Sequence, residues 1–164
     1  MADAALGNSQ YAKHFEEDYD WLVKTFEWRS HLDRIDPPPG TALEPNNESW
    51  YQSPEGLIYG FDKGINSAIF DTRVDHVLNH TRRIQRVDGN AHGVMETANP
   101  LQTLDDVYRQ RGTQTGNDID VRIESGFTIP AGADSTKFYP NQPCTRLAVN
   151  GVQVITAFPW PTCP

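Results

Sequence analysis

The sequence predicts an α+β fold, in which N-terminal helices pack on a C-terminal antiparallel β-sheet. Apolar residues recur with helical spacing before Gly112, and they alternate with polar residues, as in strands, after Gly116. Near the C-terminus, Asn150–Gly151 separates two β-rich runs. This dipeptide is a strong hairpin signal, because the central positions of such a turn need positive φ. The 164 residues, 37% of them hydrophobic, suit one domain with a short appendage.

The N-terminal part is predicted to be one long helix over residues 10–35, with Ser9 as its N-cap. The run Pro37–Pro39 ends this helix, because proline has no backbone N–H and clashes with the preceding turn. We expect the apolar stripe of the helix to pack in the core; the stripe consists of Tyr11, Phe15, Tyr19, Leu22 and Phe26. The chain therefore divides into a helical appendage with a linker at 1–49 and an α+β domain at 50–164.

Shorter elements are predicted for the rest of the chain. Helices are expected at 71–85 and 101–110, with a turn at 88–90 between them. GLIYGF is expected to be a short strand or an entry turn. Strands are expected in IDVRIES, with FTIPA as its continuation, in KFYP, and in the runs TRLAVN and VQVITAFP that flank the predicted hairpin turn. Helices that come before the strands in this way are typical of an α+β domain.

Charge and composition bear on the class of protein. The net charge is −8, and residues 1–69 carry most of it, with five Lys or Arg against twelve Asp or Glu. Nucleic-acid binders are usually basic, which disfavours that class, although Arg73, Arg82, Arg83 and Arg86 form a local positive cluster. No run of 18 apolar residues exists, so we expect no membrane span. The first ten residues, MADAALGNSQ, lack the features of a signal peptide.

The two cysteines, Cys144 and Cys163, both lie near the C-terminus. Two cysteines are too few for a four-cysteine zinc site. They would form one disulfide in an oxidising compartment and would stay as thiols in a reducing cytosol. The sequence leaves both possibilities open.

Three of the five histidines fall within the segment RVDHVLNHTRRIQRVDGNAHGVM. On an ideal helix one arc of this segment packs against the protein; it consists of Val74, Val77, Leu78, Thr81 and Ile84. The neighbouring arc displays two imidazoles and two guanidiniums, from Arg73, His76, His80 and Arg83. His92 lies beyond the predicted turn, beside Gly93, and could fold back toward them.

Three interpretations of this histidine cluster are open. Histidine titrates near neutral pH and arginine grips phosphate with two hydrogen bonds, so the set fits acid–base cleavage of a phosphodiester. RNA is the favoured substrate, because its 2′-hydroxyl is a built-in nucleophile. A zinc site at His76, His80 and His92 would use the i, i+4 spacing, but no glutamate lies between to act as base and the arginines repel a cation. In the third interpretation the histidines are structural.

Several motifs, taken in order, resemble the C-terminal nuclease toxin domains of bacterial polymorphic and contact-dependent inhibition systems. They are the LIYG-like segment at 56–60, the R-x-x-H-V-x-x-H helix at 73–80, the AHGVM turn at 91–95 and the strand end TAFP at 156–159. The resemblance covers residues 56–159. Two departures are Met95, where the family usually has an aromatic residue, and Lys137, which alone could serve as the lysine that the family often carries in its sheet.

The resemblance implies an RNase of the EndoU, barnase and colicin-like fold group, which needs neither metal nor cofactor. Carried over by position, His76 and His92 are the candidate base and acid, and Arg73 would bind the scissile phosphate. His80 would be a third participant or a supporting hydrogen-bond partner, and Thr156 would place a hydroxyl near the phosphate.

The implied protein is an endoribonuclease toxin used in competition between bacteria. It would be delivered from the producing cell into the cytoplasm of a target cell. Its partners would be cellular RNA as substrate, with tRNA among the candidates, and a cognate immunity protein. The alternatives are a zinc-dependent hydrolase and a non-enzymatic protein-interaction domain that works through the acidic N-terminal helix.

Overall fold

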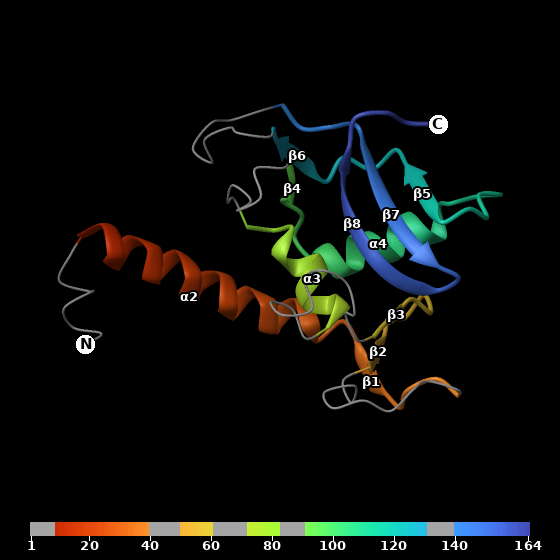
Figure 1. The fold of residues 1–164 in the computed structure, drawn as a ribbon, viewed down its shortest axis with the longest axis horizontal. Coiled ribbons are helices and arrows are strands. Elements are labelled where there is room, and N and C mark those ends of the chain that lie inside the picture. Colours follow the sequence, from red (N-terminus) through yellow and green to blue (C-terminus); the bar gives the residue numbers. More distant parts are fainter. Residues whose placement is uncertain (1–8, 40–49, 61–71, 83–90, 131–139) are drawn as a thin grey trace.

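The computed structural model describes residues 9–39, 50–60, 72–82, 91–130 and 140–164, with side chains from residue 19 onward. Its strands are β1 (Asp33–Ile35), β2 (Trp50–Gln52), β3 (Ile58–Tyr59), β4 (His92–Met95), β5 (Asp118–Val121), β6 (Gly126–Ile129), β7 (Cys144–Asn150) and β8 (Gln153–Trp160). Its helices are α2 (Ser9–Arg29), α3 (Arg73–Asn79) and α4 (Pro100–Arg109). In Figure 1, α4 lies behind the long β7–β8 hairpin, and α3 and the short strands β4 and β6 lie beside β8.

The α+β class predicted from the sequence is confirmed, with two differences in the sheet. Within the described residues, one sheet has the order β1-β2-β3-β8-β7-β5 and a second sheet consists of β4 and β6. The larger sheet is mixed rather than antiparallel, because β3 pairs parallel with β8. It is also not confined to the C-terminal half, because β1 to β3 precede α3. The fully buried core includes Leu57, Tyr59, Val77, Leu104 and Leu147.

The N-terminal helix is shorter than predicted. It ends at Arg29, and Asp33–Ile35 forms β1, which pairs antiparallel with β2. Leu32 enters the core, and the indole of Trp28 donates a hydrogen bond to the carbonyl of Ala98 at 2.8 Å. Pairing of β1 with β2 therefore overrides the helical pattern after Arg29, and contacts cross the boundary that was predicted at residue 49.

The predicted burial of the apolar stripe is wrong where side chains are described. Tyr19, Leu22 and Phe26 are 59%, 49% and 75% exposed. The helix packs through its other side, where Trp21 and Trp28 lie against the core. The tryptophans have the larger apolar surface to bury, and each indole N–H also has a partner in the body of the protein.

The histidine-bearing helix exists, but only Arg73–Asn79 is helical in the described residues. Thr72 caps it by accepting a hydrogen bond from the backbone N–H of Asp75, and His80 follows as the C-cap. Residues 83–90, which contain the predicted turn at 88–90, lie outside the described residues. The AHGVM segment, expected as a turn, is the strand β4 and pairs antiparallel with β6.

The C-terminal hairpin is confirmed. β7 and β8 pair antiparallel, and Asn150 lies opposite Gln153. The two turn residues are therefore Gly151 and Val152, one position later than expected, and Gly151 has the positive φ of +63°. The first three residues of the FTIPA run belong to β6, which pairs with β4 rather than continuing β5. The predicted KFYP strand begins at Lys137, within residues 131–139 that lie outside the described part.

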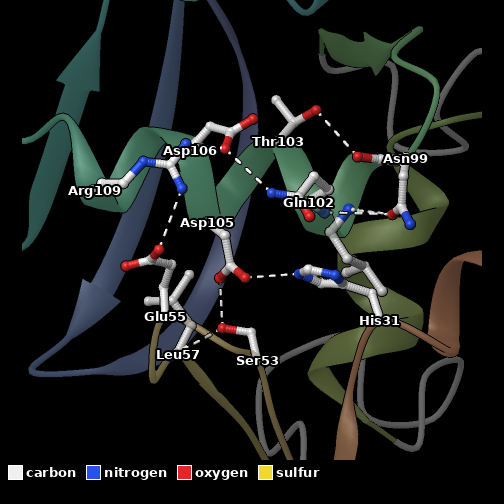
Figure 2. Close-up of polar contacts among 11 residues, drawn as sticks. His31, Ser53, Glu55, Leu57, Asn99, Gln102, Thr103, Asp105, Asp106 and Arg109 are labelled. Atoms are coloured by element: carbon white, nitrogen blue, oxygen red, sulfur yellow. Dashed lines mark hydrogen bonds and ion pairs between the residues drawn. The ribbon is translucent and has the colours of Figure 1, made fainter.

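The predicted helix at 101–110 is confirmed as α4, which carries a buried polar network on its inner side. Asp105 is 1% exposed, and its two carboxylate oxygens meet Nε2 of His31 at 2.7 Å and the hydroxyl of Ser53 (Figure 2). Ser53 also accepts a hydrogen bond from the N–H of Leu57. One carboxylate thus joins the segment after α2, the β2–β3 turn and α4.

Cys144 and Cys163 form a disulfide, with their Cα atoms 5.6 Å apart. The bond fastens the chain that follows β8 to the start of β7. No helix within the described residues is long and apolar enough to cross a membrane.

We expect reduction of this disulfide to lower the free energy of unfolding by about 3 kcal/mol, because the bond closes a short loop and so restricts the unfolded chain. Urea unfolding with and without dithiothreitol measures the difference. A Cys144→Ser/Cys163→Ser variant should be as unstable as the reduced protein and insensitive to dithiothreitol. Equal midpoints for the wild type in both conditions would contradict the expectation.

A second stability prediction concerns Tyr59, whose hydroxyl is buried without a hydrogen-bond partner among the described residues. Burial, and then the charge of Asp105, raise the pKa of Tyr59 well above its usual value. The folded protein therefore favours the neutral phenol. Its contribution to the free energy of unfolding is fully present below the usual tyrosine pKa of about 10, and it is lost as the pH rises above that value. Tyr59→Phe should keep or increase stability at pH 7, by up to about 1 kcal/mol, and should lessen the decline at alkaline pH.

Urea unfolding of both proteins at pH 7 and pH 10.5 tests this prediction. A loss of stability in Tyr59→Phe at pH 7 would show that the hydroxyl has a favourable partner.

Candidate functional site

A cavity of about 480 Å³ opens between α3, β8 and the two-stranded sheet of β4 and β6. It contains three of the five site residues predicted from the sequence, namely His76, His80 and Thr156. The rest of its lining has an aromatic part formed by Phe158 and Trp160 and a polar part formed by Thr128 and Gln142, and it is completed by Ala91, Gly93, Pro159 and Pro161. This volume suits a ligand the size of a nucleotide or a small drug.

The strand β8 supplies one wall of the cavity. Thr156, Phe158 and Trp160 are spaced two residues apart, so they point to the same face of the strand. Ala157, between them, is fully buried on the other face. Side chains on one face of β8 therefore pack in the core, and side chains on the opposite face line the cavity.

The helix α3 supplies the two imidazoles. Val74, Val77 and Leu78 are buried and fix the helix against the core, and this leaves His76 and His80 toward the cavity. Their ring centroids are 6.0 Å apart. Two groups that each hydrogen-bond at roughly 2.8 Å to different oxygens of one phosphate lie at a similar separation.

The orientation of His80 is set by β4. Its Nδ1 lies 2.8 Å from the carbonyl oxygen of Gly93, and its own carbonyl accepts a hydrogen bond from the N–H of Met95. A carbonyl oxygen only accepts hydrogen bonds, so Nδ1 carries the proton and Nε2 is the acceptor nitrogen in the neutral ring. The ring of Phe158 lies 5.9 Å from that of His80.

His92 lies behind His80 and does not line the cavity. Its side chain is 1% exposed, its ring stacks on His80 at 5.1 Å, and its Nε2 lies 2.9 Å from the carbonyl oxygen of Arg82. The structure therefore brings His92 next to the predicted histidines, but as a buried neighbour of His80 rather than as a group in the cavity.

Thr156 and Arg73 connect α3 with β8. The guanidinium of Arg73 donates to the carbonyl oxygen of Ile155 at 3.0 Å, immediately before Thr156 in the chain. Arg73 does not line the cavity, whereas Thr156 does. Within the described residues, the hydroxyl oxygen of Thr156 is buried and has no hydrogen-bond partner. A buried hydroxyl of this kind is well placed to bind an oxygen atom of a ligand.

Gly93 allows β4 to approach β8 closely. A Cβ atom at this position would lie 2.7 Å from Cβ of Phe158 and 3.2 Å from Cδ of Pro159. Any larger residue would push apart the strand that orients His80 and the strand that carries Thr156. The glycine is thus a requirement of the cavity itself.

Of the described residues that line the cavity, eight were not predicted as site residues, and four of these carry an aromatic or polar side chain: Thr128, Gln142, Phe158 and Trp160. For Phe158 and Trp160 a signal existed, because they follow Thr156 at strand spacing in the predicted hairpin. For Thr128 and Gln142 no local pattern exists, because their places depend on the pairing of β6 with β4.

The histidines are not arranged around a common point. Among the described residues, no group of three or more His, Cys, Asp or Glu side chains could hold a metal ion. The geometry thus gives no support to the zinc site at His76, His80 and His92. Lys137, the lysine suggested by the resemblance, lies outside the described residues.

Comparisons of the chain with protein-family models, with curated proteins and with solved structures found no match. Fold and site together define an α+β domain with a cavity lined in part by two histidines.

Proposed function

We propose that the chain is a metal-independent endoribonuclease whose active site is the cavity lined by His76, His80 and Thr156. The observation that carries this proposal is the convergence of two imidazoles, 6.0 Å apart, with a buried hydroxyl that has no hydrogen-bond partner among the described residues. A phosphodiester needs one group to take a proton, one to give a proton and a donor for its oxygens. The cavity holds all three.

In the proposed reaction, Nε2 of His80 takes the proton from the 2′-hydroxyl of RNA. The 2′-oxygen attacks the adjacent phosphorus, the bond from phosphorus to the 5′-oxygen breaks, and His76 protonates the departing oxygen. The products are a 2′,3′-cyclic phosphate and a 5′-hydroxyl end. Thr156 donates a hydrogen bond to a phosphate oxygen as negative charge develops on it. His80 is assigned as the base because its contact with Gly93 makes Nε2 the acceptor nitrogen.

The burial of His92 supports a change in its role. We place it as a positioning residue that holds the ring of His80 from behind, in place of the acid or base suggested by the resemblance. We also place Arg73 as a positioning residue. Its guanidinium holds β8 through the carbonyl oxygen of Ile155, the residue immediately before Thr156. Both residues thus support the site without lining the cavity.

The biological setting proposed is that of a toxin delivered into competing bacteria, with an immunity protein in the producing cell. The motifs that resemble such toxin domains support it, because three of the residues that they supply line one cavity. The disulfide between Cys144 and Cys163 is also suited to a protein that passes through an oxidising environment.

The test is incubation of the purified chain with total bacterial RNA in excess EDTA, beside His76→Ala. We expect discrete fragments with 2′,3′-cyclic phosphate ends from the wild type only, and sequencing of the fragment ends identifies the target. Intact RNA in both samples would overturn the proposal. Equal cleavage in both would overturn the role of His76.

A second candidate function, that of a protein-binding domain, is favoured by one observation. Tyr19, Leu22, Val23 and Phe26 expose their apolar side chains along α2, and Asp20 and Glu27 beside them are exposed as well. Isolated exposed apolar residues are common, but a continuous stripe on one helix is typical of a binding surface.

Expression in bacteria separates the two candidates. A ribonuclease toxin should be toxic without its immunity partner, and His76→Ala should relieve the toxicity. A protein-binding domain should be harmless, and Phe26→Asp should abolish binding of its partner while His76→Ala leaves binding unchanged.

A further inference from the structure

We infer that the aromatic end of the cavity receives one unpaired nucleobase against Trp160, so that the substrate is single-stranded RNA. This inference rests on the proposed function for the position of the reacting phosphate. The contacts that carry it lie at the other end of the cavity. They involve Trp160, Phe158 and the polar pair of Thr128 and Gln142.

Trp160 lines the cavity and contributes the flat surface of its indole to it. Its ring centroid lies 5.7 Å from that of Phe158, and the two planes meet at 60° in an edge-to-face arrangement. Rings in this arrangement do not form a closed stack, so a planar ligand can lay its own face on the indole. Stacking on aromatic side chains is the usual way in which proteins hold unpaired bases.

Arg146 fixes the plane of the indole. Its guanidinium carbon lies 3.9 Å from the centroid of the Trp160 ring. Nε and Nη2 of Arg146 donate to the two carboxylate oxygens of Asp120 at 2.8 and 2.9 Å, so the guanidinium is held in both position and rotation. One face of the indole is thus covered by a planar cation, and a ligand can stack only on the other face.

The backbone around Trp160 is also fixed by contacts with neighbouring segments. Trp160 pairs with Cys144 in the β7–β8 ladder, and the disulfide from Cys144 to Cys163 fastens the chain just beyond it. A platform that is already ordered loses little conformational freedom when a ligand binds.

The side of the cavity formed by Thr128 and Gln142 can recognise the edge of a base. Thr128 Oγ1 donates to Oε1 of Gln142 at 2.7 Å. That bond occupies one lone pair of the amide oxygen and orients the amide; within the described residues this leaves Nε2 as a donor and the threonine oxygen as an acceptor. A donor next to an acceptor matches the hydrogen-bonding edge of a nucleobase, whereas a purely apolar ring would leave both groups unsatisfied. A base within a duplex has this edge already paired, which is why we infer a single-stranded substrate.

The experiment compares three uncleavable probes by isothermal titration calorimetry. They are a single-stranded 2′-O-methyl RNA hexamer of mixed sequence, an abasic hexamer with the same phosphates, and a 2′-O-methyl duplex. We expect the single strand to bind about five- to a hundredfold more tightly than the abasic strand, as stacking of one base provides. We expect the duplex to bind no better than the abasic strand. Trp160→Ala should remove the preference for bases.

Arg146→Lys tests whether the guanidinium holds the indole in place. Lysine keeps the charge but loses both the two hydrogen bonds to Asp120 and the flat surface against Trp160. We expect it to weaken binding of the single strand and leave binding of the abasic strand unchanged. Arg111→Lys is the matched control. The guanidinium of Arg111 lies over the ring of Tyr108 at the same distance of 3.9 Å, but neither residue lines the cavity.

The inference and the proposed function fail in different ways. Equal binding of the hexamer and the abasic strand by the wild type, or an unchanged preference in Trp160→Ala, would overturn the inference even if RNA is cleaved. A preference for bases that depends on Trp160, together with intact RNA in the cleavage assay, would keep the inference as a binding site and overturn the nuclease. Efficient cleavage of duplex RNA would also overturn the inference.

Discussion

His80→Ala is expected to lower the rate of RNA cleavage about 10²- to 10⁴-fold, the usual loss when a general base is removed. His80 lies in the cavity, its Nδ1 is directed at the carbonyl of Gly93, and its backbone is bound to β4. Replacing His80 by alanine removes Nε2, the atom that accepts the proton in the proposed reaction, and leaves Thr156 in place. The rate is best measured with a short RNA labelled at both ends, under single-turnover conditions, so that product release does not limit it.

His92→Phe is the matched comparison for this prediction. Phenylalanine can keep the stacked ring behind His80 but cannot form the contact with the carbonyl of Arg82. We expect only about a fivefold to tenfold loss, equivalent to one hydrogen bond. If His92→Phe is as inactive as His80→Ala, His92 is the acid or base and the burial of its ring does not represent the active state.

Asp105→Ala is expected to cause the largest loss of stability. The carboxylate is buried and accepts from His31 and Ser53, so its removal leaves two buried polar groups unsatisfied (Figure 2). Each such group costs about 1–3 kcal/mol, which for two groups predicts a decrease of about 2–6 kcal/mol in the free energy of unfolding. Urea unfolding followed by tryptophan fluorescence measures it.

Asp106→Ala is the control on the same helix. Asp106 pairs with Arg109 at the surface, where an ion pair contributes about 0–1 kcal/mol. Two adjacent aspartates should therefore differ several-fold in their effect. Alanine favours the helix at both positions, so propensity cannot cause a loss. Equal losses from both variants would show that the buried network contributes no more to stability than the surface ion pair.

The parts of the fold that depend on local pattern were predictable. Alternation of Ile119 and Val121 predicted β5, and the apolar face of residues 101–110 predicted α4. The parts that depend on distant partners were not. The change from helix to β1 after Arg29 needs β2, and the parallel pairing of β3 with β8 has no local signature.

The site residues also fall into those that could be predicted from the sequence and those that could not. His76 and His80 were identified because helical spacing places them on one edge of α3, and Thr156 because the resemblance pointed to it. The contact of Trp160 with Arg146 crosses the β7–β8 hairpin, and that of Thr128 with Gln142 joins β6 to the segment before β7, so neither follows from the pattern of a single element. Helical spacing also could not show that His92 is buried, because its place is set by the pairing of β4 with β6.

The strand β8 lies inside the larger sheet, between β3 and β7, and it carries Thr156, Phe158 and Trp160. During synthesis it is made after every other strand described. A ribosome that has made the chain up to residue 152 therefore holds both imidazoles without the wall that β8 supplies. Because a domain generally completes its fold only once the whole unit has emerged, we expect the cavity to form only after Trp160 has been synthesised. If the chain has the proposed ribonuclease activity, that activity would arise only once this last strand is in place.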